Sequence, residues 1–335
     1  MEFLLSKHKE KLNFCGRYGF LNDILYLEFT ASGFEFCGDF NNSDVVIDTE
    51  IKAENGLLAV ILDDEFESMK EIPVFAGEQK ITIAENLNGK HTVKVLKLVE
   101  YSKGFYAIKS LIFDGSLLQK PKQRALKFEF YGDSLTCGYG NLSSNRESPN
   151  PFGLLEHGYR TWAALLCEKM GAQMSAVSSS GQGVLTDCGG NPECVIFKYY
   201  DMALPSFKIK WNFNDYQPDV IFVYIGTNDI NYWRMNENAE PDWADFDKAS
   251  KVLLESLREK CPNSKIVYLL GHDAGNIYFD GVEKEYKALA SQYDNVYYCG
   301  GLSSTQSGGD WHPNLSDHKM IFEKLYKFVS ENIKL

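Results

Sequence analysis

Residues 1–120 consist of short apolar, β-favouring runs separated by turn-forming residues. No stretch in this part has the three-to-four spacing of apolar residues that a helix of useful length requires. Turn signals such as Glu54-Asn55-Gly56 and Asn86-Leu87-Asn88-Gly89 separate the runs. Strands are expected at 24–29, 45–48, 57–62, 80–83 and 91–96. Many short strands at this spacing are typical of a β-sandwich or jelly roll, which we predict for this part of the chain.

The pattern changes after residue 125, where apolar strands alternate with helical periodicities. Strand followed by helix, repeated, is typical of a mostly parallel sheet that helices cover on both faces, which is a three-layer α/β/α arrangement. Strands are predicted at 125–130, 173–177, 219–225, 265–270 and 296–298, and helices at 162–170, 246–257, 282–293 and 321–333.

The stretch 117–124 lies between these two patterns and is polar, basic and interrupted by Pro121. Such a composition is typical of a linker between domains. The chain of 335 residues is also long enough for two cores. We therefore predict two domains, an N-terminal β-sandwich at 1–120 and an α/β domain at 125–335.

The composition is that of an ordinary globular protein, with 44% hydrophobic and 24% charged residues. A net charge of -12 argues against nucleic acid or an anionic membrane as partner, because those associations need clustered Lys and Arg. Neutral substrates fit this charge better. The first residues lack the apolar stretch of a signal peptide, so the expected location is the cytoplasm, or outside the cell if a leader has been removed.

The eight cysteines are scattered along the chain. In a cytoplasmic protein they are expected to be reduced. Only Cys188 and Cys194 are close enough in sequence to pair locally, and we expect two free thiols there. A metal site would need further ligands that are not visible nearby, so neither a metal nor a cofactor is predicted.

Polar, glycine-bearing loops follow the predicted strands of the second domain. In an open parallel sheet, functional groups gather at the carboxyl ends of the strands. Ser134 follows the first strand, and a last loop leads directly into the C-terminal helix. The sequence therefore predicts that four loops converge on one rim, namely those around Ser134, 180–183, 226–229 and 308–314.

The residue types in these loops suit acyl transfer. Ser134 could attack an ester carbonyl, and His312 could accept its proton and later protonate the leaving alcohol. The developing oxyanion needs hydrogen-bond donors. The backbone N–H groups of Ser134 and Gly181 and the side-chain amide of Asn228 are the predicted donors. A serine in a strand-ending turn is weak evidence alone, but His312 and Asn228 in the matching loops favour a nucleophile.

These motifs resemble a known family. Gly-Asp-Ser-Leu at 132–135, Gly181, Gly-Thr-Asn-Asp at 226–229 and Asp-Trp-His-Pro-Asn at 310–314 resemble the four blocks of the GDSL or SGNH hydrolases. The longer form at 132–140, after a β-rich region, resembles carbohydrate esterase family 2. That family joins an N-terminal jelly roll to an SGNH domain and removes O-acetyl groups from xylan and mannan.

The resemblance implies a metal-independent serine esterase that acts on an acetylated oligosaccharide. It leaves the helper of His312 open, because the acid of the general pattern stands three residues before the histidine, where this chain has Gly309. Asp310 lies only two residues before. Some family 2 esterases use a Ser-His dyad steadied by a backbone carbonyl. We expect Asp310 to complete a triad, with the dyad as the alternative.

Other polar residues near the rim are predicted to have structural roles. Asp133 is expected to be a buried acceptor that shapes the serine loop, and Asp229 to cap the segment that follows it. His318 is expected to be a surface or packing residue. His272 and Asp273 end the fourth strand, and a contact with substrate is possible there.

The tryptophans are expected to fall into two groups, one in the core and one at the rim. Trp162 lies on the apolar stripe of a predicted helix and is expected in the core. Trp311 and Trp233 fall in predicted rim loops, where their rings are candidates for stacking on the apolar faces of sugars. Both are predicted substrate-binding residues.

Two alternatives to a carbohydrate deacetylase remain at this point. One is a broad short-chain esterase or lysophospholipase on the same fold. The other is a non-catalytic carbohydrate-binding protein, against which the intact Ser134, Asn228 and His312 argue.

Overall fold

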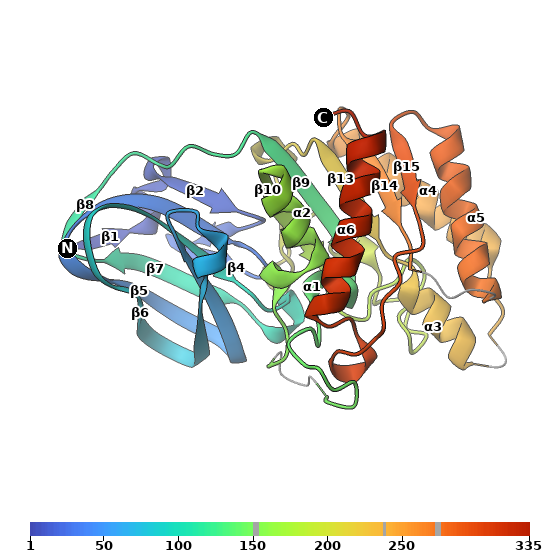
Figure 1. The fold of residues 1–335 in the computed structure, drawn as a ribbon, viewed down its shortest axis with the longest axis horizontal. Helices are drawn as coiled ribbons and strands as arrows, with labels where there is room; N and C mark the ends of the chain where they lie inside the picture. The colour runs from blue at the N-terminus through green and yellow to red at the C-terminus, as the bar shows by residue number, and fades with distance from the viewer. Residues whose placement is uncertain (150–153, 237–238, 272–275) are drawn as a thin grey trace.

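The computed structural model describes residues 1–149, 154–236, 239–271 and 276–335. Within these residues, the N-terminal part forms an eight-stranded sheet and the C-terminal part a five-stranded sheet with helices beside it (Figure 1). A short hairpin of β11 (Met202–Leu204) and β12 (Ile209–Lys210) stands apart from both sheets. None of the helices in these ranges is long and apolar enough to cross a membrane.

The N-terminal sheet is antiparallel throughout its pairings. The prediction of a β-rich region without a long helix is therefore confirmed. Its strands are β1 (Glu2–Leu4), β2 (Leu12–Cys15), β3 (Gly19–Leu21), β4 (Ile24–Leu27), β5 (Gly33–Leu62), β6 (Lys70–Lys97), β7 (Tyr106–Ile112) and β8 (Gly115–Leu117).

Strands β5 and β6 are far longer than the short runs expected from the sequence. The predicted turns at 54–56 and 86–89 lie inside these strands, where the pairing shifts register between Ile51 and Asn55 and near Asn86. Asn86 has φ 52°, the left-handed conformation that asparagine tolerates. The turn-forming residues therefore bend paired strands at bulges and do not end them.

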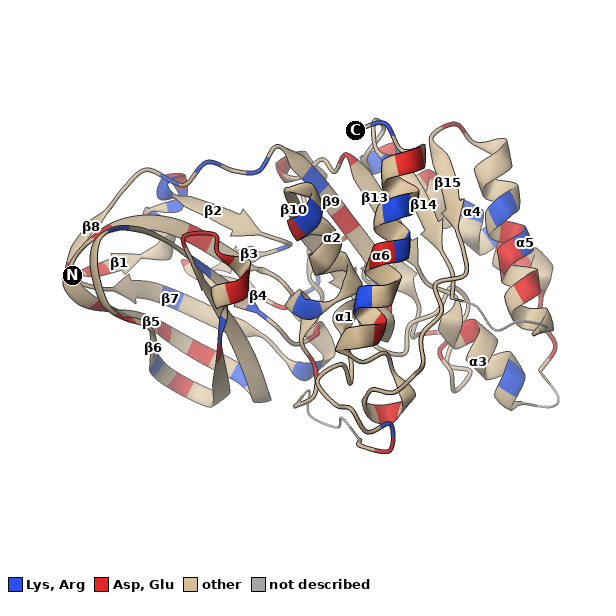
Figure 2. Ribbon diagram, in the orientation of Figure 1, with Lys and Arg blue, Asp and Glu red and all other residues tan. Residues whose placement is uncertain are grey.

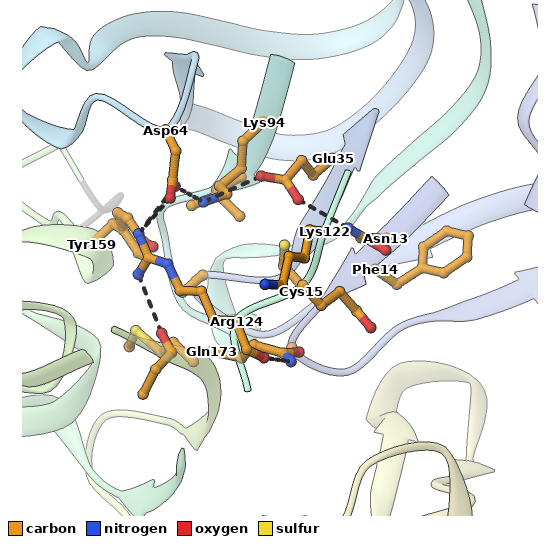
Figure 3. A pocket seen from close by; sticks show the side chains of 16 residues that line it. Asn13, Phe14, Cys15, Glu35, Asp64, Lys94, Lys122, Arg124, Tyr159 and Gln173 are labelled. Atoms are coloured by element: carbon orange, nitrogen blue, oxygen red, sulfur yellow. Dashed lines mark hydrogen bonds and ion pairs between the residues drawn. The ribbon is translucent and has the colours of Figure 1, made fainter. Parts of the chain in front are cut away.

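The segment between β8 and β9 (Leu126–Gly132) matches the predicted linker, but it is held at its end. Arg124 lies 3.0 Å from Asp64 and 2.7 Å from Glu168, which belong to the N-terminal and C-terminal parts of the chain. Figure 3 shows Asp64 between Arg124 and Lys94, beside a cavity of about 60 Å³. The neighbouring Lys94 and Arg124 lower the pKa of Asp64, although its partial burial opposes them. Ion pairs thus fix the linker to both parts.

The C-terminal sheet is parallel, as predicted. Its strand order is β10-β9-β13-β14-β15, with β9 at an inner position. Each strand pairs with its neighbour in parallel register, so all the carboxyl ends lie at one edge. The other strands are β10 (Ala172–Ser178), β13 (Val220–Tyr224), β14 (Lys265–Leu269) and β15 (Val296–Cys299).

Helices cover both faces of this sheet. Alternate strand residues point to opposite sides, so Phe130 packs with helices α2 (Trp162–Met170) and α6 (Leu315–Asn332). Tyr131 packs on the other side with the cluster that α3 (Thr227–Met235), α4 (Trp243–Lys260) and α5 (Ile277–Gln292) supply. Figure 2 shows charge concentrated on the helices, while the strands between them are mostly uncharged. The three-layer arrangement follows from this packing.

Three of the four predicted helices begin earlier than their apolar periodicity. The helices α4, α5 and α6 each start at a side-chain cap, formed by Asp242, Asn276 and Asn314 respectively. Helix α2 matches its prediction and ends at Gly171, whose φ of 63° suits a glycine. Helix α3 was expected to be a loop, and that prediction is wrong.

Candidate active site

Ser134 lies where β9 turns into the short helix α1 (Ser134–Cys137). Asp133 caps this helix, since its carboxylate accepts a hydrogen bond from the backbone N–H of Leu135 at 3.0 Å. The predicted structural role of Asp133 is therefore confirmed. Gly138 ends the helix with φ 84°, a conformation that favours glycine. The serine is thus fixed at the carboxyl end of an inner strand.

The predicted serine and histidine meet. Nε2 of His312 lies 2.9 Å from Oγ of Ser134, although the two residues are far apart in sequence. The other ring nitrogen, Nδ1, lies 2.6 Å from the backbone carbonyl oxygen of Asp310. A carbonyl oxygen only accepts, so Nδ1 carries the proton and Nε2 is left as the acceptor for the serine hydroxyl.

The carboxylate of Asp310 has a different partner. It accepts a hydrogen bond from the hydroxyl of Tyr139 at 3.3 Å, while the ring of Tyr139 packs on His312 with 4.7 Å between the centroids. Asp310 therefore contacts His312 through its main chain and not through the side chain that a triad requires. The expectation of an aspartate triad is corrected to a dyad steadied by a backbone carbonyl.

Backbone hydrogen bonds to other segments fix the loop that carries Asp310. Asp310 has φ 51° within the 3₁₀ turn η9 (Gly309–Trp311), and its N–H donates to the carbonyl of Ser148 at 2.8 Å. The N–H of Gly309 donates to the carbonyl of Gly140 at 2.8 Å. A Cβ on Gly140 would lie only 2.2 Å from the Gly309 oxygen, so this close approach requires glycine. The serine loop and the histidine loop thus brace each other.

Burial changes the protonation equilibrium of His312. It lowers the pKa of His312 below the ordinary value of 6.5, while the carbonyl and the charge of Asp310, and the charge of Glu100, act in the opposite direction. The imidazole is therefore neutral at pH 7. A neutral ring is the form that can accept the serine proton.

The three predicted oxyanion donors differ in whether they already have a hydrogen-bond partner. No described residue accepts a hydrogen bond from the backbone N–H of Ser134 or Gly181. Gly181 has φ 82°, and a Cβ there would meet nothing within 4 Å, so this face of the loop is open. Asn228 differs, because its amide donates to the carbonyl of Gln182 at 2.7 Å and to Asp133 at 3.3 Å.

Asp229 has a larger role than the predicted cap. Its buried carboxylate accepts hydrogen bonds from the backbone N–H groups of Val184, Leu185 and Thr186 at 2.8, 2.7 and 3.2 Å. Burial raises the pKa of Asp229 to about 6, although those three donors lower it. Asp229 therefore fixes the loop that follows Gly181 and does not cap its own helix.

The two rim tryptophans differ in exposure. Trp233 is 4% exposed and packs against Trp243, Phe246 and Tyr278, so its prediction as a substrate-binding residue is wrong. Its apolar ring is buried because the segment after Asn228 is helix α3 and not a loop. Trp311 is 51% exposed beside the dyad, and the guanidinium of Arg146 lies 4.8 Å from its ring centroid. Its exposure leaves the ring accessible, and its role in substrate binding stays a prediction.

The remaining predicted residues are placed as follows. Trp162 is buried in the core, as expected. His318 is also buried, and its Nδ1 accepts a hydrogen bond from the N–H of Trp162. All the cysteines, including Cys188 and Cys194, are free, which agrees with two thiols. His272 and Asp273 lie outside the described residues.

Sequence reasoning missed Tyr139. Its position in the Gly-Tyr-Gly stretch at 138–140 was visible, but the contact with His312 depends on two loops that meet only in the fold. Among the described residues, no group of three or more His, Cys, Asp or Glu side chains is arranged to hold a metal ion.

Residues 130–318 match the GDSL-like Lipase/Acylhydrolase family, a span that includes Ser134, Gly181, Asn228 and His312. The chain belongs to this family. The matched residues of this GDSL-like family member include all four predicted motif blocks, which follow strands of the parallel sheet.

This member of the GDSL-like family is similar to proteins that are named as esterases. It is 29% identical over 252 residues to the cellulase/esterase CelE of Acetivibrio thermocellus, a match that spans 71% of this chain but only 29% of that longer protein. It is 23% identical over 302 residues to an acetylxylan esterase/glucomannan deacetylase of Cellvibrio japonicus, covering 83% of this chain and 79% of the relative.

Solved structures show the same fold. A family two carbohydrate esterase from Clostridium thermocellum, in complex with cellohexaose, has a TM-score of 0.86 at 24% identity and covers 96% of this chain and 99% of its own. A family two carbohydrate esterase from Cellvibrio japonicus has a TM-score of 0.85 at 19% identity, covering 99% and 97%. The fold of this chain, N-terminal sheet included, is that of the family two carbohydrate esterases.

Proposed function

We propose that the protein is a serine esterase that removes O-acetyl groups from plant-type carbohydrates, such as acetylated xylan or mannan oligosaccharides. The observation that carries this proposal is the contact of 2.9 Å between Oγ of Ser134 and Nε2 of His312, with Nδ1 held by the Asp310 carbonyl. That geometry leaves the imidazole ready to accept the serine proton.

In the proposed first half-reaction, Oγ of Ser134 attacks the acetyl carbonyl carbon while its proton moves to Nε2 of His312. The tetrahedral intermediate carries a negative oxygen, which the N–H groups of Ser134 and Gly181 stabilise. Asn228 can join them by exchanging its 3.3 Å hydrogen bond to Asp133 for the oxyanion. The bond from carbon to the sugar oxygen then breaks, and His312 returns the proton to that oxygen.

In the second half-reaction, a water molecule takes the place of the sugar. His312 accepts a proton from the water as its oxygen attacks the acetyl-Ser134 carbonyl, and the same donors stabilise the second oxyanion. Collapse breaks the bond to Oγ, and His312 protonates the serine. The products are the free enzyme and acetic acid, which releases its proton to the solvent and becomes acetate, so the reaction balances without any other reactant.

The preference for carbohydrate rests on Trp311 and on the named relatives. An exposed indole beside the dyad offers a flat apolar surface on which a sugar ring can stack. Relatives are named as an acetylxylan esterase/glucomannan deacetylase, and a structural neighbour is described in complex with cellohexaose. These names support acetylated xylan and mannan fragments as substrates.

We also infer how the chain is divided. The antiparallel sheet supports an N-terminal jelly-roll domain at 1–120, and the parallel sheet with its helices supports a catalytic domain at 125–335. Fixed ion pairs of Arg124 at the junction imply that the two domains form one working unit.

The test is acetate release from acetylated xylan, acetylated glucomannan and simple sugar acetates, together with 4-nitrophenyl esters of increasing acyl length. Ser134→Ala is the control. We expect acetate from the acetylated carbohydrates, a preference for acetyl over long acyl chains, and loss of activity by at least about 10³-fold in Ser134→Ala.

Two outcomes would contradict the proposal in different ways. A clear preference for long acyl chains would indicate a lysophospholipase-like esterase. Glycan binding without acetate release from any substrate would indicate a binding protein on an esterase fold.

A further inference from the structure

We propose that Glu100, a residue of the N-terminal part of the chain, is a positioning residue of the ester-hydrolysing site. It holds the oxyanion loop, defined here as residues 179–182, and the serine helix α1 in their working geometry. This inference rests on the proposed function. It assigns a catalytic duty to the N-terminal part, which otherwise contributes none of the reacting groups.

One carboxylate oxygen joins the two loops. Oε2 of Glu100 accepts a hydrogen bond from the backbone N–H of Ser180 at 2.5 Å, and the thiol of Cys137 lies 3.6 Å from the same oxygen. Ser180 immediately precedes Gly181, and Cys137 is the last residue of the helix that Ser134 begins. Glu100 therefore contacts both the helix that begins with the nucleophile and the residue that precedes an oxyanion donor.

The carboxylate is itself held in place. Glu100 is fully buried three residues after the end of β6, at the start of the 3₁₀ turn η4 (Tyr101–Lys103). Nζ of Lys97 donates to the carbonyl of Glu100 at 2.9 Å, and the N–H of Glu100 donates to the carboxylate of Glu156. Nζ of Lys103 lies 3.7 Å from Oε1 of Glu100. The first two contacts fix the backbone that carries Glu100, and Lys103 lies beside its carboxylate, so the side chain can fix the geometry of what it touches.

The oxyanion loop needs such support. Its residues belong to no strand or helix, and Gly181 adds conformational freedom at φ 82°. Within the loop, the hydrogen bond from the N–H of Gln182 to the carbonyl of Ser179 is long, at 3.5 Å. Ser180 and Gly181 are consecutive, so anchoring the Ser180 N–H limits the directions in which the Gly181 N–H can point. A hydrogen bond to a charged acceptor is also stronger than a neutral one.

The negative charge of Glu100 also favours the transfer of the serine proton to His312. Its negative field favours the positive imidazolium that His312 becomes when it takes the serine proton, alongside the contribution of Asp310. In a dyad no carboxylate contacts Nδ1, so a buried carboxylate nearby supplies part of that stabilisation. Position and charge therefore both support Glu100 as a positioning residue.

The experiment compares two buried glutamates of the N-terminal part. Glu100→Ala removes the proposed anchor. Glu28→Gln is the control, because the Glu28 carboxylate also accepts a hydrogen bond from a backbone N–H of the C-terminal part, that of Ser206 at 3.0 Å, and Ser206 belongs to neither the oxyanion loop nor α1. For each protein, kcat and KM for 4-nitrophenyl acetate are measured per active site, with sites counted by stoichiometric reaction of Ser134 with a phosphonate.

We expect Glu100→Ala to lower kcat by about 10- to 100-fold with KM within about 2-fold, because the oxyanion exists only in the transition state. Glu28→Gln should keep kcat per active site within about 2-fold. A general loss of folding would reduce the number of titrated sites in both variants and leave kcat per site unchanged.

Glu100→Asp keeps the proposal testable if the alanine variant does not fold. It preserves the charge but withdraws the oxygen from Ser180, and kcat per site should still fall by about 10-fold. Either Glu100 variant that folds with kcat within about 2-fold of the parent would overturn the inference. An inactive parent protein would instead overturn the proposed function, so the two failures are distinguishable.

Discussion

At the scale of single residues, the orientation of His312 depends on the main chain. The carbonyl of Asp310 accepts from Nδ1 at 2.6 Å and selects the tautomer, which is the task that a buried carboxylate performs in a triad. The Asp310 side chain is free to bond Tyr139 instead. The left-handed φ of Asp310 turns its carbonyl toward the ring, and aspartate and asparagine tolerate that conformation better than most residues.

Asp310→Asn therefore tests the dyad directly. Asparagine keeps the left-handed backbone and the carbonyl oxygen, so kcat/KM for an acetyl ester should stay within about 5-fold of the parent. A triad aspartate would lose about 10⁴-fold on the same change. His312→Ala, measured in parallel, should lose at least about 10³-fold and shows that the assay reports the dyad. A large loss in Asp310→Asn with unchanged folding would restore the triad.

The pH profile reports on the same histidine. Burial lowers the pKa of His312 below 6.5, and the ring must be neutral to accept the serine proton. Activity should therefore be full above that pKa and be lost as the pH falls through it. We expect the acid limb of kcat/KM to have its midpoint below 6.5, measured from about pH 4 to about pH 8. A midpoint above 6.5, with the protein folded throughout, would contradict the burial argument.

The placement of the residues proposed to react was predictable from sequence, because each follows a strand that can be recognised. Ser134, Gly181, Asn228 and His312 come together as expected. The burial of Trp233 was not predicted, because the segment after Asn228 is too short for its apolar spacing to separate a helix from a loop until the packing of α3 is known. The contact of the Asp310 carbonyl was also hidden, because motif spacing carries no information on main-chain direction.

At the scale of elements, helix α6 connects the histidine loop to the core. It begins two residues after the proline that follows His312, at a capping box in which Asn314 accepts from the N–H of Asp317 at 3.0 Å and Asp317 accepts in return from the N–H of Asn314. The apolar stripe starts a turn and a half later, which is why the predicted helix began at Ile321. Caps are polar, so apolar periodicity alone misses the first turn.

Asn314→Ala should reduce the free energy of unfolding by about 1 kcal/mol, the usual worth of an N-cap side chain. The matched control is Asn332→Ala at the other end of the same helix, where the amide donates to the Phe328 carbonyl in an exposed turn. That change should cost less than about 0.5 kcal/mol. Urea denaturation followed by circular dichroism measures both, and equal losses would contradict a specific role for the cap.

The strands of the N-terminal sheet show what a local sequence pattern does not predict. Their existence was predicted, but their continuity was not, because Asn and Gly residues mark turns and bulges alike. Glu54-Asn55-Gly56 stays within β5 because neighbouring segments of β6 continue to pair with it on both sides of the register shift. Only the long-range pairing decides between a turn and a bulge, and a local pattern does not contain it.

At the scale of the whole molecule, the two parts of the chain share one buried polar network. Arg17, from the loop after β2, is fully buried and lies 3.1 Å from the carboxylate of Glu129 on β9, the strand that leads to Ser134. The same guanidinium donates to the carbonyls of Tyr200 and Met202 and to the hydroxyl of Tyr131. The N-terminal part therefore reaches into the core beside the catalytic strand.

Arg17→Met should lower the free energy of unfolding by about 3–5 kcal/mol, because it leaves the buried carboxylate of Glu129 without a compensating charge. Adding Glu129→Gln removes that charge and should recover part of the loss. Tyr131 and Ser175 donate to separate oxygens of the carboxylate at 2.7 and 2.9 Å, so the amide oxygen keeps one of these hydrogen bonds, and the amide N–H can donate to the other hydroxyl. Chemical denaturation of the parent and of both variants gives the three free energies. A cost below about 1 kcal/mol for Arg17→Met, or a double variant no more stable than the single one, would show that the two parts of the chain do not depend on this pair.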